Sequence, residues 1–107
     1  MRWTGNIDWL YYDNRPSDTN ACELRIHDGE VVLSYEFEGA KPAVLRGPDA
    51  GDGHYGVLKG WQDESVIQTT LHIRPGDLVG EGYWTETSDG SQSDAGLCRV
   101  RLKLEEE

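Results

Sequence analysis

The chain is expected to fold as one all-β domain, a small antiparallel up-and-down β-barrel of about eight strands, and three features of its sequence predict this. Its 107 residues suffice for one hydrophobic core but not for a core and a second lobe, so residues 1–107 are one domain. Apolar and polar residues alternate with a period of two, and no stretch longer than a turn has helical periodicity. Extended segments recur roughly every 10 to 14 residues between turn residues, which favours antiparallel pairing of neighbours.

The first extended segment, residues 2–12, carries the widest apolar stripe in the chain. A period of two places Trp3, Ile7, Trp9 and Tyr11 on one face of this strand. No single hairpin could cover two indoles and a phenol. The following segments are therefore expected to wrap a sheet around this stripe.

Four later segments alternate clearly between an apolar face, expected to point inward, and a mainly polar face. In chain order, the expected inward residues are Cys22, Leu24 and Ile26; Val31, Leu33, Tyr35 and Phe37; Ile67, Thr69, Leu71 and Ile73; and Cys98, Val100, Leu102 and Leu104. Asp28-Gly29, between the first two of these segments, is a strong signal for a two-residue hairpin turn.

Two central segments define their orientation less clearly. Residues 43–46 leave the inward face open, because two adjacent residues are apolar. In residues 54–61, Trp61 is expected to face inward in phase with Tyr55. Lys59 shares that face, so either the lysine lies at a wet end or the phase breaks.

The seventh segment, residues 78–87, has two glycines in phase with an aromatic residue, since Gly80, Gly82 and Trp84 share one face. Glycines spaced two apart cost stability in a strand and mark a bend or a close approach of another backbone. A barrel corner is expected here.

Closure of the barrel by pairing of the last segment with the first is expected, because an open meander would leave two edges exposed to aggregation. An open meander or a β-sandwich is the alternative. The connections alternate between two ends: residues 13–20, 39–42, 62–65 and 88–96 at one, and residues 28–29, 47–53 and 74–77 at the other. The long polar stretches 13–20 and 88–96 identify the first end as the mouth.

Composition argues against several classes of partner and site. A net charge of −10 disfavours nucleic acid as a partner, because such binding depends on Lys and Arg neutralising phosphates. The chain has no apolar run of membrane-spanning length and no leader, so a cytoplasmic protein without a membrane partner is expected. His27, His54 and His72 fall in separate segments without ligand spacing, so no metal site or cofactor is expected.

Three features of the chain resemble the calycin superfamily, which includes lipocalins, fatty-acid-binding proteins and avidins. These are Trp3 with Gly5 nearby, the succession of about eight strands, and the pair Arg99 and Arg101 in the last segment. In those families a Trp near the start of the first strand packs at the closed end, often beneath a basic side chain from the last strand. Their order is Gly-x-Trp, whereas this chain has Trp-x-Gly. The resemblance implies a barrel closed near Trp3 and open at the opposite end.

The aromatic residues are the main guide to function. Four Trp and five Tyr stand against one Phe, and their polar tips suit a wetted cavity or an interface. The prediction is a non-enzymatic protein, monomer or homodimer, that binds a small, partly apolar ligand through Trp9, Tyr11, Tyr35, Trp61 and Trp84. The alternative is an acidic protein-interaction or inhibitor module with an external aromatic patch. No nucleophile elbow or phosphate loop is present, so catalysis is not expected.

Cys22 and Cys98 are expected to be free, buried thiols. In a closed meander they lie on the two strands that flank the first one. Two inter-strand spacings of about 4.8 Å each separate them by roughly 9 Å, which exceeds the limit of about 7 Å between the Cα atoms of a disulfide.

Overall fold

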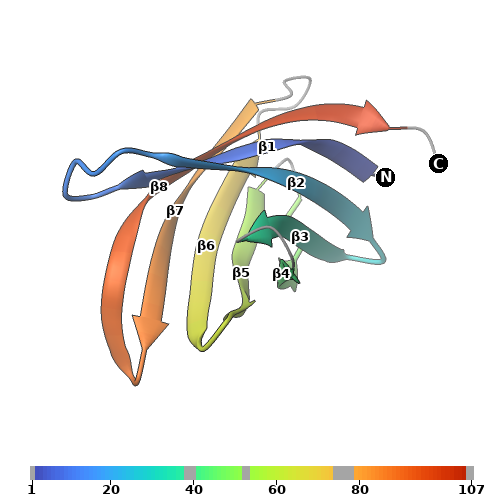
Figure 1. Cartoon of the computed structure of the whole chain (residues 1–107). Helices are drawn as coiled ribbons and strands as arrows, with labels where there is room; N and C mark the ends of the chain where they lie inside the picture. Colours follow the sequence, from blue (N-terminus) through green and yellow to red (C-terminus); the bar gives the residue numbers. More distant parts are fainter. Residues whose placement is uncertain (1, 38–40, 52–53, 74–78, 106–107) are drawn as a thin grey trace.

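The computed structural model describes residues 2–37, 41–51, 54–73 and 79–105, excepting the side chains of residues 37, 41 and 54–56. Those residues form a closed antiparallel barrel in which each strand pairs with the next in the chain (Figure 1). The strands are β1 (Arg2–Tyr11), β2 (Asp18–His27), β3 (Glu30–Phe37), β4 (Lys41–Pro48), β5 (His54–Gln62), β6 (Ser65–Ile73), β7 (Val79–Ser88) and β8 (Ser91–Glu105). The predicted all-β up-and-down barrel is confirmed.

The last strand closes the barrel against the first. β8 pairs with β1 along the whole of β1, from Arg2 opposite Glu105 to Tyr11 opposite Gly96. Ile7 lies opposite Val100 in this ladder, and both side chains are fully buried. Closure removes the exposed edges that an open meander would have had.

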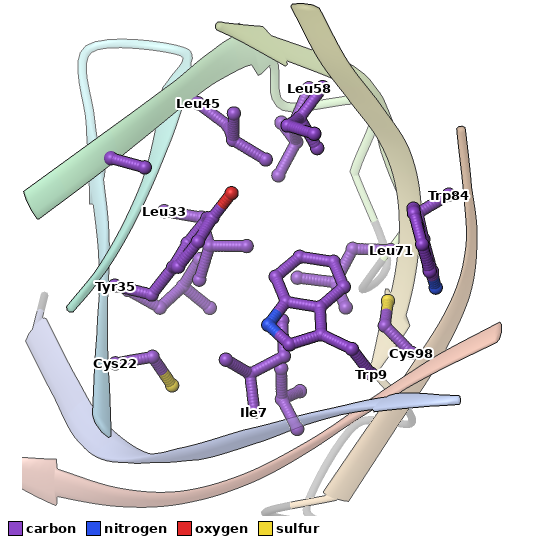
Figure 2. Packing of buried hydrophobic residues seen from close by; sticks show 14 of the residues in the cluster. Ile7, Trp9, Cys22, Leu33, Tyr35, Leu45, Leu58, Leu71, Trp84 and Cys98 are labelled. Carbon is purple, nitrogen blue, oxygen red and sulfur yellow. The ribbon is translucent and has the colours of Figure 1, made fainter. Parts of the chain in front are cut away.

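The middle of the barrel is filled by aliphatic side chains from most of its strands (Figure 2). The fully buried aliphatic residues are Ile7, Leu24, Val31, Leu33, Leu45, Leu58, Leu71 and Val100. The predicted inward faces of β2, β3, β6 and β8 supply most of them. The expected inward orientation of Leu104 is wrong, since this residue is exposed. It lies beyond Arg101, the last residue of β8 that pairs with a described residue of β7.

The expected inward orientation of Trp61 is wrong. Trp61 is 64% exposed and Lys59 is exposed with it, whereas Leu58 is fully buried. The pairing of β5 with β6 shifts register between Tyr55 and Leu58, and this irregularity moves the even-numbered residues of β5 to the interior. Of the two alternatives for Lys59, a wet end or a break in the alternation of β5, the break is therefore correct.

The expected loop at residues 88–96 is also wrong. β7 runs to Ser88 and β8 begins at Ser91, so Asp89 and Gly90 alone make the turn. Both have positive φ, 52° and 78°, as the central residues of a type I′ hairpin turn require. The polar residues that follow continue the strand at its solvated end, and a polar composition does not prevent ladder pairing.

The predicted Asp28-Gly29 turn is confirmed, with φ values of 52° and 78°. At Gly82 the structure shows the other meaning of such glycines, a close approach of a neighbouring backbone, rather than giving evidence for the expected barrel corner: a Cβ atom there would lie 1.9 Å from the backbone oxygen of Thr70. The expected inward side chains of Phe37 and Tyr55 and the turn at residues 74–77 lie outside the described residues.

The free state of the two cysteines is confirmed, and both are buried. Cys22 pairs across the ladder with Gly5, whereas Cys98 pairs with Trp9, so they lie on opposite sides of β1 and at different heights. Burial raises the pKa of the Cys22 thiol to about 12 and also raises the pKa of Cys98.

Hydrogen exchange tests the closure. Backbone amides near Ile7 and Val100 should be among the slowest to exchange, because both strands lie between paired neighbours and their exchange requires global unfolding. Deuterium exchange followed by NMR would measure this. Early exchange along β8 would show that the sheet opens between β8 and β1.

Thiol titration tests the state of the cysteines. In the native protein at mildly alkaline pH both thiols should react slowly, because they are buried and protonated. In denaturant without a reductant, two thiols per chain should react at once. A count of zero would mean that the cysteines form a disulfide and that the closed strand order is wrong.

Candidate functional site

A cavity of about 340 Å³ lies at the end of the barrel predicted to be its mouth. The β5–β6 and β7–β8 hairpins project side by side at this end (Figure 1). The lining residues are Trp9, Tyr11, Asp18, Thr19, Asn20, Tyr35, Gln62, Ile67, Trp84, Glu86 and Asp94. They combine four aromatic rings with three carboxylates and two amides.

The cavity exists because the inward faces of several strands change in character toward the mouth. The change runs from Ile7 to Trp9 and Tyr11 on β1, from Leu33 to Tyr35 on β3, from Leu58 to Gln62 on β5, and from Gly82 to Trp84 and Glu86 on β7. Aliphatic residues close the middle of the barrel, while rings and polar groups line the space above them.

Four aromatic rings contact one another in a chain, in the order Tyr35, Trp9, Trp84 and Tyr11. Figure 2 shows the indole of Trp9 between Tyr35 and Trp84. The ring centroids of Trp9 and Tyr35 are 5.0 Å apart, those of Trp9 and Trp84 are 5.6 Å apart, and those of Tyr11 and Trp84 are 5.5 Å apart. The two contacts of Trp84 are edge-to-face, with interplanar angles of 83° and 85°, a preferred geometry for aromatic pairs.

The polar tips of these rings are satisfied by the protein itself. Trp9 Nε1 donates to Asn20 Oδ1 at 2.9 Å, and the Tyr35 hydroxyl donates to Gln62 Oε1 at 2.5 Å. Trp84 Nε1 donates to the backbone oxygens of Leu97 at 3.0 Å and Leu10 at 3.3 Å. The rings are therefore held in place before any ligand arrives, and they offer it chiefly their apolar surface.

Gly96 makes room for the Trp84 ring. A Cβ atom at this position would lie 1.7 Å from the backbone oxygen of Leu10 and 3.1 Å from Trp84 Nε1. Any larger residue would push β8 away from β1 where the indole forms its hydrogen bonds. The glycine thus positions one wall of the cavity.

Three carboxylates surround the aromatic wall. Asp18 accepts a hydrogen bond from the Tyr11 hydroxyl, and Glu86 accepts one from Ser93 Oγ at 3.3 Å. Asp94 forms an ion pair of 2.6 Å with Arg15, whose guanidinium carbon lies 4.4 Å from the centroid of the Tyr11 ring.

These charges affect the phenols. Partial burial, with the hydrogen bond to Asp18 and the charges of Asp18 and Asp94, raises the pKa of Tyr11 to about 12, although Arg15 opposes this shift. Burial, with the charge of Glu86, raises the pKa of Tyr35 further. Both phenols are therefore neutral hydrogen-bond donors at neutral pH.

Four of the five predicted ligand-binding residues meet at this cavity, namely Trp9, Tyr11, Tyr35 and Trp84. Trp61 does not, because it lies on the outer face of β5. The polar lining residues were missed. Two of them carried a signal: Gln62 is in phase with Leu58, and Glu86 is in phase with Trp84.

Other sequence-derived candidates lie elsewhere. Arg99 pairs with Glu81 and Arg101 pairs with Asp8, all on the outer wall, so neither arginine makes its ion pair at Trp3. In the described part of the chain, no group of three or more His, Cys, Asp or Glu residues has the geometry to hold a metal ion. The same residues contain no helix of the length and hydropathy needed to cross a membrane.

The raised pKa of Tyr11 predicts a dependence of stability on alkaline pH. Because the folded-state pKa of about 12 exceeds the ordinary value of 10.0, the stabilisation from the protonated phenol is complete below pH 10 and is lost as pH rises toward 12. The difference in unfolding free energy between wild type and Tyr11→Phe should therefore shrink over that range in urea titrations. In an Asp18→Asn background this decline should be smaller and end at lower pH, because the folded-state pKa of Tyr11 loses the contribution of Asp18. A constant difference up to pH 12 would contradict the assignment.

Comparison with known proteins leaves the function to be inferred from this geometry: no protein-family model, no curated protein and no solved structure matches the chain.

Proposed function

We propose that the protein is a non-enzymatic binder of a small, partly apolar ligand, held in the cavity at the barrel mouth. The observation that carries this proposal is the meeting of four rings from β1, β3 and β7 around a space of about 340 Å³. That volume is at the lower end of the range for small-molecule pockets, roughly 300 to 1,000 Å³. A ligand covering these rings would gain roughly 25 cal/mol per Å² of apolar contact.

The arrangement of polar groups adds to this support. The hydrogen bonds of the ring tips use the amide oxygens of Asn20 and Gln62, which leaves the amide NH₂ groups as donors at the cavity. A pocket with apolar walls and a few fixed polar groups both binds a ligand and orients it.

The second candidate, an acidic interaction or inhibitor module, is favoured by a separate feature. Leu10 lies opposite Leu97 and Leu97 lies opposite Tyr83, so three exposed apolar side chains form a row on the outer face of β1, β8 and β7. Trp61 is exposed as well, on β5. This function requires binding that depends on the outer row and not on the cavity.

We also propose that the protein is related to the calycin superfamily and that it is located in the cytoplasm. The closed meander in chain order, with β8 next to β1, supports the kinship. The two free cysteines support a reducing compartment, since disulfides are characteristic of oxidising ones. Like the ligand itself, both are proposals.

Tryptophan fluorescence tests the proposed function. Trp61→Phe removes the most exposed indole and leaves Trp3, Trp9 and Trp84, so quenching in this variant reports on the interior. A screen of small aromatic amines, alcohols and carboxylates should yield compounds that quench it saturably. The proposal fails if no compound does so.

Two matched variants then locate the binding. Tyr11→Ala removes a ring at the cavity. It should raise the Kd of a compound found in the screen about tenfold, equivalent to about 1.4 kcal/mol of lost contact. Tyr83→Ala removes the same side chain from the outer wall and should leave affinity unchanged. The opposite result would favour the interaction module. Thermal unfolding would show that both variants fold cooperatively.

A further inference from the structure

We propose that the ligand of this cavity is a small organic cation, an amine or ammonium group attached to an apolar body. This inference rests on the proposed function and names its ligand class. Aromatic faces attract cations through their quadrupole, and carboxylates add charge-assisted hydrogen bonds to an ammonium group. The mouth of this barrel brings both kinds of group into one space.

The charged residues at the cavity are of one sign. Asp18, Glu86 and Asp94 line it together with the four rings, and none of the lining residues is Lys, Arg or His. Glu86 pairs with no lysine or arginine in the part of the chain that the structure describes, where its side chain accepts from Ser93 Oγ. Its negative charge acts on Tyr35, another lining residue, and contributes, after burial, to raising the pKa of that phenol. An anionic ligand would therefore meet repulsion here, and a cation would be attracted.

Arg15 shows that this rim accepts a cation. Its guanidinium lies over the face of Tyr11, 4.4 Å from the ring centroid, and bonds Asp94 at 2.6 Å and Asp13 at 2.7 Å. Tyr11 and Asp94 both line the cavity. The chain's own side chain thus makes, at the rim, the ring and carboxylate contacts that we infer for a ligand cation beside Glu86, which lies opposite Asp94 in the ladder between β7 and β8.

The charge of the whole molecule acts in the same direction. With 20 acidic and 10 basic residues, the protein has a net charge of −10. Such an excess raises the local concentration of small cations around the molecule and increases their rate of association. The attraction weakens as salt screens it, which separates it from purely apolar binding.

Three probes with one apolar body and different charges test the inference on the wild-type protein. Phenylbutylamine is cationic at neutral pH, phenylbutanol is neutral and phenylbutyrate is anionic. Isothermal titration calorimetry should show the amine binding at least about tenfold more tightly than the alcohol, with the carboxylate weakest. Added salt should lower the affinity for the amine more than the affinity for the alcohol.

A charge-matched pair of variants on β7 locates the effect. Glu86→Gln removes the carboxylate at the cavity, and Glu81→Gln makes the same change in net charge on the outer wall. Glu86→Gln should lower the affinity for the amine about tenfold and leave the affinity for the alcohol unchanged. Glu81→Gln should change the affinity for either probe by less than about twofold.

The possible failures are distinguishable. If the alcohol binds as tightly as the amine, or if Glu86→Gln binds the amine as wild type does, the cation inference is wrong while the proposed function stands. If none of the three probes binds, the inference is wrong, and the fluorescence screen of the Trp61→Phe variant decides separately whether the proposed function falls with it. Should Glu86→Gln not fold, the relative affinities of the three probes for the wild-type protein still support or overturn the cation inference.

Discussion

The structure depends on enclosing the indole of Trp9. This residue belongs to β1, its ring contacts those of Tyr35 on β3 and Trp84 on β7, and its N–H bonds Asn20 on β2. Loss of a buried aromatic ring costs about 3–5 kcal/mol, and a buried N–H without an acceptor would add a further penalty. One side chain therefore requires four strands to hold fixed relative positions. Closure of β8 on β1 completes the enclosure, because Trp9 lies opposite Cys98 in that ladder.

The same arrangement leaves space above the rings rather than filling it. Tyr35, Trp84 and Trp9 reach their hydrogen-bond acceptors within the barrel, so their orientation does not depend on a ligand. A site that is already organised loses little conformational entropy on binding. The carboxylates stand at the rim, where water reaches them in the free protein and the cost of burying a charge does not arise.

The outer wall and the mouth differ in how their charges are balanced. On the wall, arginines pair with acids across neighbouring strands, as in Arg99 with Glu81 and Arg101 with Asp8. These pairs are largely exposed and contribute little to stability, about 0–1 kcal/mol each. At the mouth, among the residues that the structure describes, Arg15 pairs with Asp94, whereas the acids Asp18 and Glu86 accept hydrogen bonds from Tyr11 and Ser93. The carboxylates of Asp18 and Glu86 therefore keep their negative charge at the cavity without a described basic partner.

The alternation of apolar and polar residues was enough to predict the number of strands, their order, the closure and most of the inward faces, because a period of two is a local property that a pleated strand converts directly into sidedness. It also placed Trp9, Tyr11, Tyr35 and Trp84 on inward faces, whereas the end of the barrel where they meet was assigned from the polar stretches 13–20 and 88–96, the second of which is a tight hairpin and not a loop. The orientation of Trp61 could not be predicted in this way, since a register shift in β5 depends on the partner strand β6 and not on the local pattern. The polar half of the site likewise depended on contacts between distant strands. Asp18, Asn20 and Asp94 resemble ordinary loop residues in the sequence, and they became part of a cavity only when strand pairing extended to the rim and brought three hairpins around the same rings.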